Sequence, residues 1–149
     1  MRKTIPDFLP PYDSVVPHWH KQAGFAGAGK TFHAEPCSGT LSGDIQAHIE
    51  GTEYRINTVS DRIVQAHRKT PCDGGFVWEW VGVQALKGTG ILPTVKKALK
   101  QLPFYERSVL GWDVIHTPDR THVLEVNTSP GVNAATAKRI VKVIMEVTE

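Results

Sequence analysis

The stretch that most constrains the fold is residues 111–131, GWDVIHTPDRTHVLEVNTSPG. Apolar and polar residues alternate in GWDVIH and HVLEVN, and TPDR is typical of a turn, so the stretch predicts a β-hairpin. A hairpin centred on Asp119 places Asp113 directly opposite Glu125, and Asn127 points to the same side as Glu125. Like charges opposite each other destabilise a sheet, so this pair requires a cation.

The bulk properties are those of an ordinary globular protein. At 149 residues the chain can form one compact domain or two small lobes. Its net charge of +2 is too small to indicate nucleic acid as the main partner. The sequence has no apolar run long enough to predict a membrane span, and residues 1–13 lack the apolar segment of a signal peptide. Cys37 and Cys72 lie far apart and indicate a reducing compartment, so a cytoplasmic location is predicted.

The other β segments precede the 111–131 hairpin. Residues 14–22 and 31–36 predict short strands, and the connector 44–51 has a strand-like pattern. A second hairpin is predicted over residues 52–70, with its turn near Ser60 and Asp61. Residues 71–80, PCDGGFVWEW, are assigned to a loop.

Two amphipathic helices complete the pattern. Residues 91–102 place apolar side chains on one face and three lysines on the other. Thr94 is expected to cap the first helix, because a proline at position 93 disfavours helical backbone in the residue before it. Residues 133–147 predict the second helix, with Asn133 or Thr136 as its cap. The order of elements predicts an α+β fold with mostly antiparallel pairing.

The acidic hairpin carries the first chemical hypothesis. Two carboxylates and one amide oxygen form a hard-oxygen site, so Asp113, Glu125 and Asn127 are candidate ligands of Mg²⁺ or Mn²⁺. The alternative is that Glu125 is a solvated strand residue and Asn127 a turn former. Their shared face, directly before the Ser-Pro-Gly break, favours a metal site.

The glycine-rich stretch GFAGAGK carries the second hypothesis. Gly24, Gly27 and Gly29 allow the backbone to approach an anion and turn its N–H groups toward it. The match to G-x-x-x-x-G-K-T is literal, so a P-loop around Lys30 is a rival interpretation. A flexible loop without a ligand is another. A P-loop requires a helix after the lysine, whereas FHAEP is no helix start.

Basic residues on predicted strands carry the third hypothesis. Lys21, Arg55, Arg68 and Lys69 suit phosphate oxygens if they face a cleft, and arginine can bind them bidentately. Each alone is better explained as an exposed surface residue, and only as a set beside a metal site do they indicate a phosphate site. The histidines share no metal-ligand spacing, and the tryptophans are assigned to the core or to contacts between lobes.

The sequence GWDVI followed by VLEVNTSPG resembles the signature of the ATP-grasp superfamily, in which an aspartate is followed by a glutamate and then by an asparagine two residues further. Asp113, Glu125 and Asn127 match it residue for residue. Upstream, GTEYRINTV and IVQAHRKT resemble strands of the bacteriophage-type members, and GFAGAGK resembles the loop that closes over the phosphates. The resemblance extends over residues 15–135. The members that the sequence resembles include the glutamate ligases that modify ribosomal protein.

This resemblance implies a minimal ATP-grasp-like fold, with two small lobes of mostly antiparallel sheet around a nucleotide cleft. Residues 1–14 would form an extended lead-in, 15–50 the glycine-loop lobe and 51–149 the metal-binding lobe. The implied cofactors are ATP and Mg²⁺ (or Mn²⁺). The implied activity is that of a carboxylate–amine or carboxylate–thiol ligase that acts through an acyl phosphate. Its acid and its amine acceptor would be small molecules or peptides.

The resemblance also implies roles for individual residues. Asp113, Glu125 and Asn127 would hold the metal. Arg55, Arg68 and Lys69 would neutralise the transferring phosphoryl group and orient the carboxylate. The nucleotide would be contacted from the glycine-loop lobe and the connector after it, by His20, Lys21, Gly24, Gly27, Gly29, Lys30, Gln46, His48 and Ile49.

The sequence departs from the family most clearly at its start. It starts almost at the glycine-loop lobe, without the additional N-terminal domain that the family's enzymes carry. A homodimer or a partner chain is therefore expected to complete the cleft. The alternative is a catalytically reduced binding module, such as a phage protein that binds nucleotide or a host partner.

Overall fold

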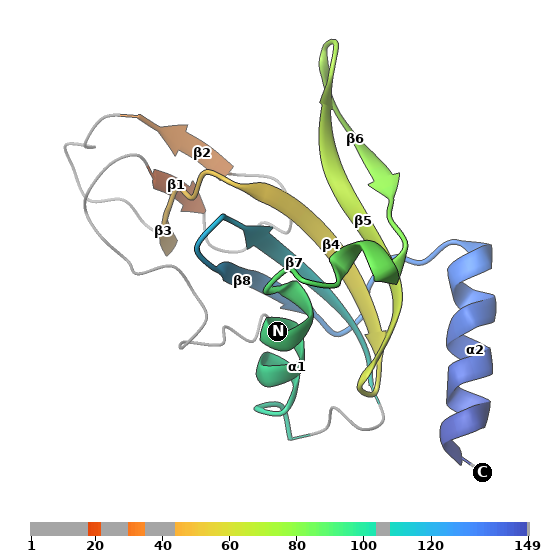
Figure 1. Ribbon diagram of the computed structural model, residues 1–149. Helices are drawn as coiled ribbons and strands as arrows, with labels where there is room; N and C mark the ends of the chain where they lie inside the picture. The colour runs from red at the N-terminus through yellow and green to blue at the C-terminus, as the bar shows by residue number, and fades with distance from the viewer. Residues whose placement is uncertain (1–17, 22–29, 35–43, 104–107, 149) are drawn as a thin grey trace. The chain divides into compact units, whose positions relative to one another are not determined.

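The computed structural model describes residues 18–21, 30–34, 44–103 and 108–148. These residues belong to two compact units, one ending at Glu50 and the other beginning at Gly51. Each unit contains one antiparallel sheet (Figure 1). The fold is α+β, as the sequence predicts. In the described part of the chain, no helix is long and apolar enough to cross a membrane.

The first unit holds a sheet of three short strands in the order β2-β1-β3. They are β1 (His18–Lys21), β2 (Lys30–His33) and β3 (Asp44–Ala47). β1 and β3 fall within segments for which the sequence predicts β structure, whereas β2 begins one residue before its predicted segment 31–36, at Lys30. Because Lys30 begins a strand and not a helix, the P-loop interpretation is wrong.

The second unit holds a five-stranded sheet in the order β6-β5-β4-β7-β8. Its strands are β4 (Thr52–Val59), β5 (Arg62–Cys72), β6 (Gly75–Trp80), β7 (Val109–His116) and β8 (Thr121–Asn127). Both predicted hairpins are confirmed. The first turns at Ser60, whose φ is +51°.

The loop expected at residues 71–80 is wrong, because β6 occupies most of it and pairs with β5. Cys72 and Gly75 are partners, so only Asp73 and Gly74 form the turn between the strands. Asp-Gly is a strong signal for a two-residue hairpin turn, and Gly74 has the positive φ, +83°, that such a turn requires. The residues after it are aromatic and β-branched, which favours a strand.

The helices are α1 (Ile91–Leu99) and α2 (Ala134–Thr148), with a short 3-10 helix η2 (Val83–Leu86) before them. The expected cap at Thr94 is wrong, because its N–H already donates to the carbonyl of Gly90 within the first turn (3.2 Å). A proline is tolerated in that turn, where no N–H bond is needed. At α2 the predicted cap is confirmed, since Asn133 Oδ1 accepts the N–H of Thr136 (2.9 Å).

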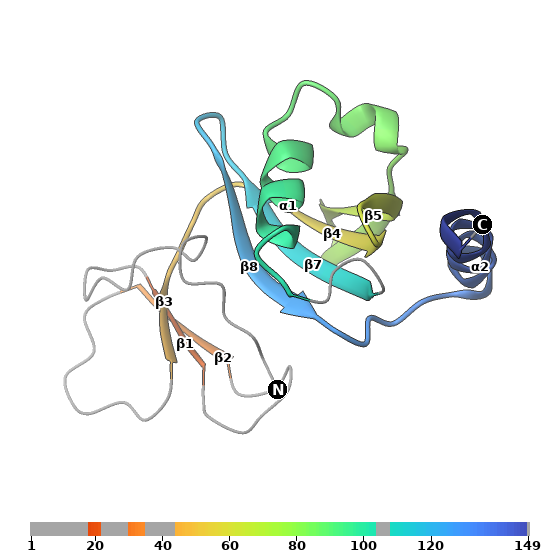
Figure 2. The ribbon, with the colours of Figure 1, turned by 90° about the horizontal axis from the view of Figure 1, so that it is seen from below.

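The main core lies between α1 and one face of the five-stranded sheet (Figure 2). Trp112 of β7 and Ile56 of β4 are partners in the sheet, and both are buried against apolar residues of α1 such as Ile91. The indole N–H of Trp112 donates to Thr58 Oγ1 (3.0 Å), so its polar atom is satisfied inside the core. On the other face, α2 packs through Ile140.

Two β-bulges assign residues to the two faces. Between β4 and β5, Asn57 pairs with Gln65, whereas the next residue, Thr58, pairs with Ile63. Val64 is therefore an extra residue in β5. In β8 the pairing steps from Val123 to Glu125, and Leu124 is extra. In a regular strand, two residues that are separated by an odd number of positions point to opposite faces. An extra residue between them lets both point to the same face.

The bond from Trp112 to Thr58 yields a stability prediction. Replacing Thr58 with Val removes the acceptor and leaves a buried indole N–H unsatisfied, which should lower the free energy of unfolding by about 1–3 kcal/mol in urea titrations. Thr58→Ser keeps the hydroxyl and should lose less. Equal stability of Thr58→Val and wild type would contradict a role for this bond.

Candidate functional site

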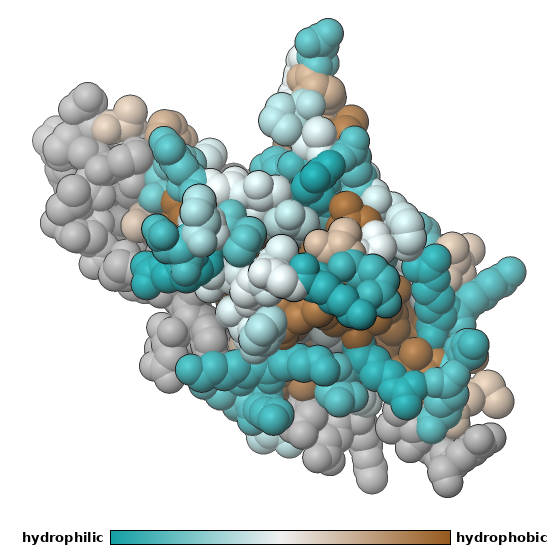
Figure 3. Space-filling model, viewed as in Figure 1, coloured by the Kyte–Doolittle hydropathy of each residue, from teal (hydrophilic) through white to brown (hydrophobic). Residues whose placement is uncertain are grey.

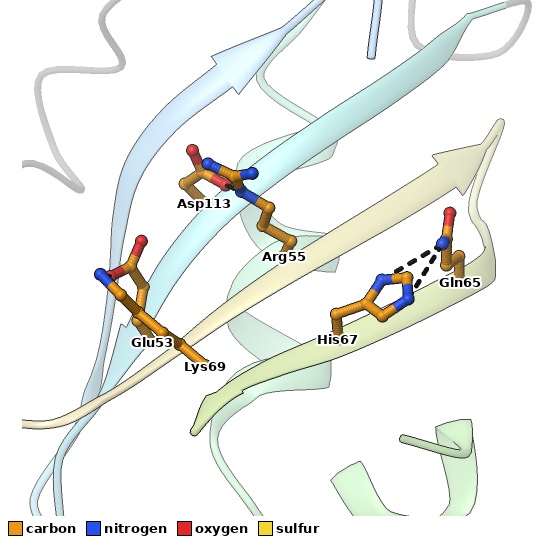
Figure 4. A network of polar contacts seen from close by, with 6 residues as sticks. All are labelled: Glu53, Arg55, Gln65, His67, Lys69 and Asp113. Atoms are coloured by element: carbon orange, nitrogen blue, oxygen red, sulfur yellow. Dashed lines mark hydrogen bonds and ion pairs between the residues drawn. The ribbon is translucent and has the colours of Figure 1, made fainter. Parts of the chain in front are cut away.

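The face of the five-stranded sheet opposite α1 carries a group of charged and amide side chains. This polar face consists of Glu53, Arg55, Asn57, Gln65, His67, Lys69, Asp113 and Glu125, most of which are shown in Figure 4. It exists because these residues alternate along β4, β5 and β7 with residues that point to the α1 side. The sequence pattern thus builds an apolar face and a polar one from the same strands.

Asp113 and Glu125 are direct partners across β7 and β8, which confirms the pairing predicted from the hairpin. The side chains of such a pair lie on the same face of the sheet. Asn127 pairs with Gly111, two positions along, and its side chain is exposed. Two carboxylates and an amide are therefore neighbours on two adjacent strands.

The electrostatics at Asp113 are unfavourable for a charged carboxylate. Burial raises the pKa of Asp113, while the guanidinium of Arg55 lowers it and the carboxylates of Glu125 and Glu53 raise it again. Arg55 Nε–H donates to Asp113 Oδ1 at 3.1 Å. Arg55 therefore offsets only part of the unfavourable environment of the Asp113 carboxylate, and a cation bound by Asp113 and Glu125 would offset more of it.

The donor set fits a hard divalent cation. Carboxylate and amide oxygens are the ligands that Mg²⁺ takes from proteins, and Asp113 and Glu125 supply the carboxylates. Within the described ranges, no three His, Cys, Asp or Glu side chains gather in a metal-binding group. A third protein ligand would therefore be the amide of Asn127, with water or a phosphate oxygen in the other positions.

The basic residues divide between the two faces. Arg55 and Lys69 lie on the polar face, where Lys69 Nζ is 2.7 Å from Glu53 Oε2. Arg68 pairs with Tyr54 and lies on the opposite face, where it is 3.0 Å from Glu79. The structure therefore brings together only two of the three basic residues for which the sequence predicts a catalytic role.

Aromatic rings of β6 hold both of these cations. The guanidinium carbon of Arg55 is 4.4 Å from the ring centre of Trp78. Lys69 Nζ is 4.3 Å from the ring centre of Phe76. Figure 3 shows apolar residues along the projecting β5–β6 arm, below its hydrophilic tip. Trp112 is in the core, as the sequence predicts, whereas Trp78 is outside the core and contacts Arg55. The predicted contacts of tryptophans between the lobes stay predictions.

The sequence interpretation missed the rest of the polar face. Asn57 Nδ2–H donates to Gln65 Oε1 (2.8 Å), and Gln65 Nε2 lies 3.1 Å from His67 Nδ1. Glu53 completes the acidic group. The signal was available, because Glu53 and Asn57 each lie two residues from Arg55, and His67 lies two from Lys69. Counting by two along each strand from a candidate residue would have found them.

The predicted nucleotide contacts are described only in part. Gly24, Gly27 and Gly29 lie outside the described residues. For four others the structure describes the strand but not the side chain, namely His20 and Lys21 in β1, Lys30 in β2 and Gln46 in β3. Their roles stay predictions.

The connector after β3 is described more fully. The Trp19 indole N–H donates to His48 Nδ1 (3.1 Å), and Phe32 lies edge-on to the His48 ring at 5.1 Å. Ile49, the residue after His48, is half-buried. A contact of His48 or Ile49 with a nucleotide base stays a prediction.

Two known proteins with a similar structure are ligases. D-alanine–D-alanine ligase from Bacillus anthracis gives a TM-score of 0.64 at 15% identity, with 91% of this chain and 55% of that chain covered. The ATP-grasp ligase PsnB, complexed with minimal precursor, Mg and ADP, gives 0.60 at 16% identity, with 89% and 47% covered. The chain therefore has the fold of ATP-grasp ligases, and it spans about half the length of these two.

Sequence comparison adds nothing to this result. No protein-family model and no curated protein matches the sequence.

Gly111 allows a close approach beside the candidate metal ligands. A Cβ at this position would lie 2.7 Å from Pro130 Cβ and 3.2 Å from Asn57 Oδ1. Gly111→Ala should therefore displace the segment after Asn127 and lower the free energy of unfolding by about 1–3 kcal/mol. Gly131→Ala is the matched control, because a Cβ there has no neighbour within 4 Å. Equal urea midpoints of the two variants would contradict the close packing.

His67 yields a pH prediction. Burial lowers its pKa, and the nearby Arg55 lowers it further. The unfolded chain then binds the proton more readily, so the stability supplied by neutral His67 is present above about pH 6.5 and is lost as the pH falls below it. His67→Gln should lose less stability than wild type between about pH 8 and pH 5. Parallel stability curves would show that His67 does not contribute.

Proposed function

We propose that this protein is an ATP- and Mg²⁺-dependent ligase that joins a carboxylate to an amine through an acyl phosphate. The observation that supports this most strongly is the pairing of Asp113 with Glu125 on the polar face. The fold shared with ATP-grasp ligases supports it independently. Phosphoryl transfer needs positioning and charge neutralisation more than covalent participation by the protein, and the polar face offers charged groups of both signs.

In this proposal Asp113, Glu125 and Asn127 hold the metal ion. When bound there, Mg²⁺ would neutralise charge on the phosphate oxygens. Among the protein's own groups, the planar guanidinium of Arg55 can bind a carboxylate or phosphoryl group through two N–H bonds. Lys69 supplies a second positive charge on the same face.

The reaction then has two steps. A carboxylate oxygen of the substrate attacks the γ-phosphorus of ATP and ADP leaves, which gives an acyl phosphate. The amine nitrogen attacks the carbonyl carbon of the acyl phosphate, the bond from that carbon to the phosphate oxygen breaks, and the nitrogen releases a proton to solvent as the amide forms. Arg55 and Lys69 would orient the carboxylate in the first step and stabilise the departing phosphate in the second.

The solved ligases suggest which substrates to test first. PsnB has been solved with a precursor peptide and AMPPNP, and the Bacillus anthracis enzyme with ATP. Acidic peptides and amino acids with small side chains are therefore the first candidate acids. Each would be tested in the presence of an amine. Release of ADP that requires both the acid and Mg²⁺ would be the activity to measure.

Variants of the acidic pair test the proposal. Asp113→Asn and Glu125→Gln keep the size of each side chain but remove a metal-binding charge, so acid-dependent ADP release should fall by more than about 100-fold. Glu79→Gln is the matched control, because this exposed carboxylate pairs with Arg68 on the opposite face. It should leave the activity unchanged.

The outcomes separate the two candidate functions. Full activity in Asp113→Asn or Glu125→Gln would show that the acidic pair is not the metal site. Binding of ATP with Mg²⁺ by the wild type, without turnover of any acid, would favour a nucleotide-binding module instead of a ligase.

A further inference from the structure

We infer that Arg55 is an exchangeable counter-ion of the candidate metal site. It pairs with Asp113 when no divalent cation is bound, and it remains beside the site on the ring of Trp78 when a cation takes that carboxylate. This inference rests on the proposed function, because it takes Asp113 as a metal ligand.

The first observation is that three charged side chains share one row across the sheet. Arg55 of β4 is the direct partner of Asp113 of β7, and Asp113 is the direct partner of Glu125 of β8. The order of the charges is therefore positive, negative, negative. A cation that bridges Asp113 and Glu125 would meet the guanidinium on the same carboxylate, so the two positive groups compete for it.

The second observation is that the contact between Arg55 and Asp113 is weak enough to exchange. It consists of one bond from Nε at 3.1 Å, and the arginine side chain is 55% exposed. A bidentate pair would use two parallel N–H bonds. Asp113 is less exposed, at 22%, but the arginine end of the pair lies largely in solvent. A pair of this kind with one bond changes an equilibrium by about two- to fivefold, which a divalent cation can overcome.

The third observation is that Arg55 has a second support that does not involve Asp113. Its guanidinium carbon lies 4.4 Å from the ring centre of Trp78, which belongs to β6. A cation over an aromatic ring is attracted by the ring's quadrupole whatever happens to the carboxylate. After exchange, Trp78 would keep Arg55 next to the metal with its N–H groups available to oxygens of the substrate. Trp78 is then a positioning residue.

Lys69 provides an internal comparison on the same face. It too lies over an aromatic ring, that of Phe76, and it too pairs with a carboxylate, that of Glu53. Glu53, however, is not one of the proposed metal ligands. Removing the charge of Lys69 therefore tests the general effect of one positive charge, whereas removing that of Arg55 also releases a ligand.

Calorimetric titration with MgCl₂ alone, at constant ionic strength and without nucleotide, tests the inference. Arg55→Gln should bind Mg²⁺ about three- to tenfold more tightly than wild type, since it loses both the competing pair and the repulsion. Lys69→Gln should change the affinity by less than about twofold. Equal or weaker binding by Arg55→Gln, with wild-type near-UV circular dichroism, would overturn the inference.

A measurement on the wild type keeps the test independent of any variant's folding. The Nε–H resonance of Arg55, assigned through bonds, should move when MgCl₂ is added, because its acceptor is taken away. In Asp113→Asn the Arg55 Nε–H resonance should not move when MgCl₂ is added. A resonance that stays in place while Mg²⁺ binds would overturn the exchange but leave the metal site intact. Absence of Mg²⁺ binding in both the wild type and Arg55→Gln would overturn the metal site and the inference together.

Discussion

The opposition of two carboxylates across β7 and β8 is the constraint on which the rest of the polar face depends. Asp113 and Glu125 are direct partners, and like charges in that position weaken a sheet. Arg55 reduces the repulsion from the next strand, and Lys69 ties down Glu53, the third carboxylate that acts on Asp113. The two positive side chains thus lie beside the carboxylates whose repulsion they reduce. Both are partly exposed to solvent, so another ligand can replace them.

The two faces of the sheet can differ so sharply because β5 and β8 each contain one extra residue. In β8, Val123 and Val126 are both buried in the core although three positions separate them. A regular strand would send one of them to the polar face. The extra residue Leu124 corrects the alternation, so that Glu125 faces Asp113 while both valines face α1. A local irregularity in the ladder therefore decides where the candidate metal ligands point.

Much of this arrangement could be predicted from the sequence, and the failures have local causes. Both helices and both predicted hairpins follow from periodicity and turn residues, since these signals are local. The pair of Asp113 and Glu125 was predicted from the centre of the hairpin. His116 and Thr121 close the turn, and a regular ladder from there would pair Asp113 with Leu124. The bulge that corrects this pairing leaves no composition signal, so it could not be predicted.

Knowing which residues are charged does not tell on which face of the sheet each charge lies. Arg68 and Lys69 are neighbours in sequence, yet one pairs with Glu79 behind the sheet and the other with Glu53 on the polar face. The same holds for aromatic residues. Trp112 is central to the core, whereas Trp78, on the edge strand, lies against a cation. An aromatic ring at a sheet edge can hold an arginine near a carboxylate without adding a competing charge, so the edge strand becomes part of the site's electrostatics.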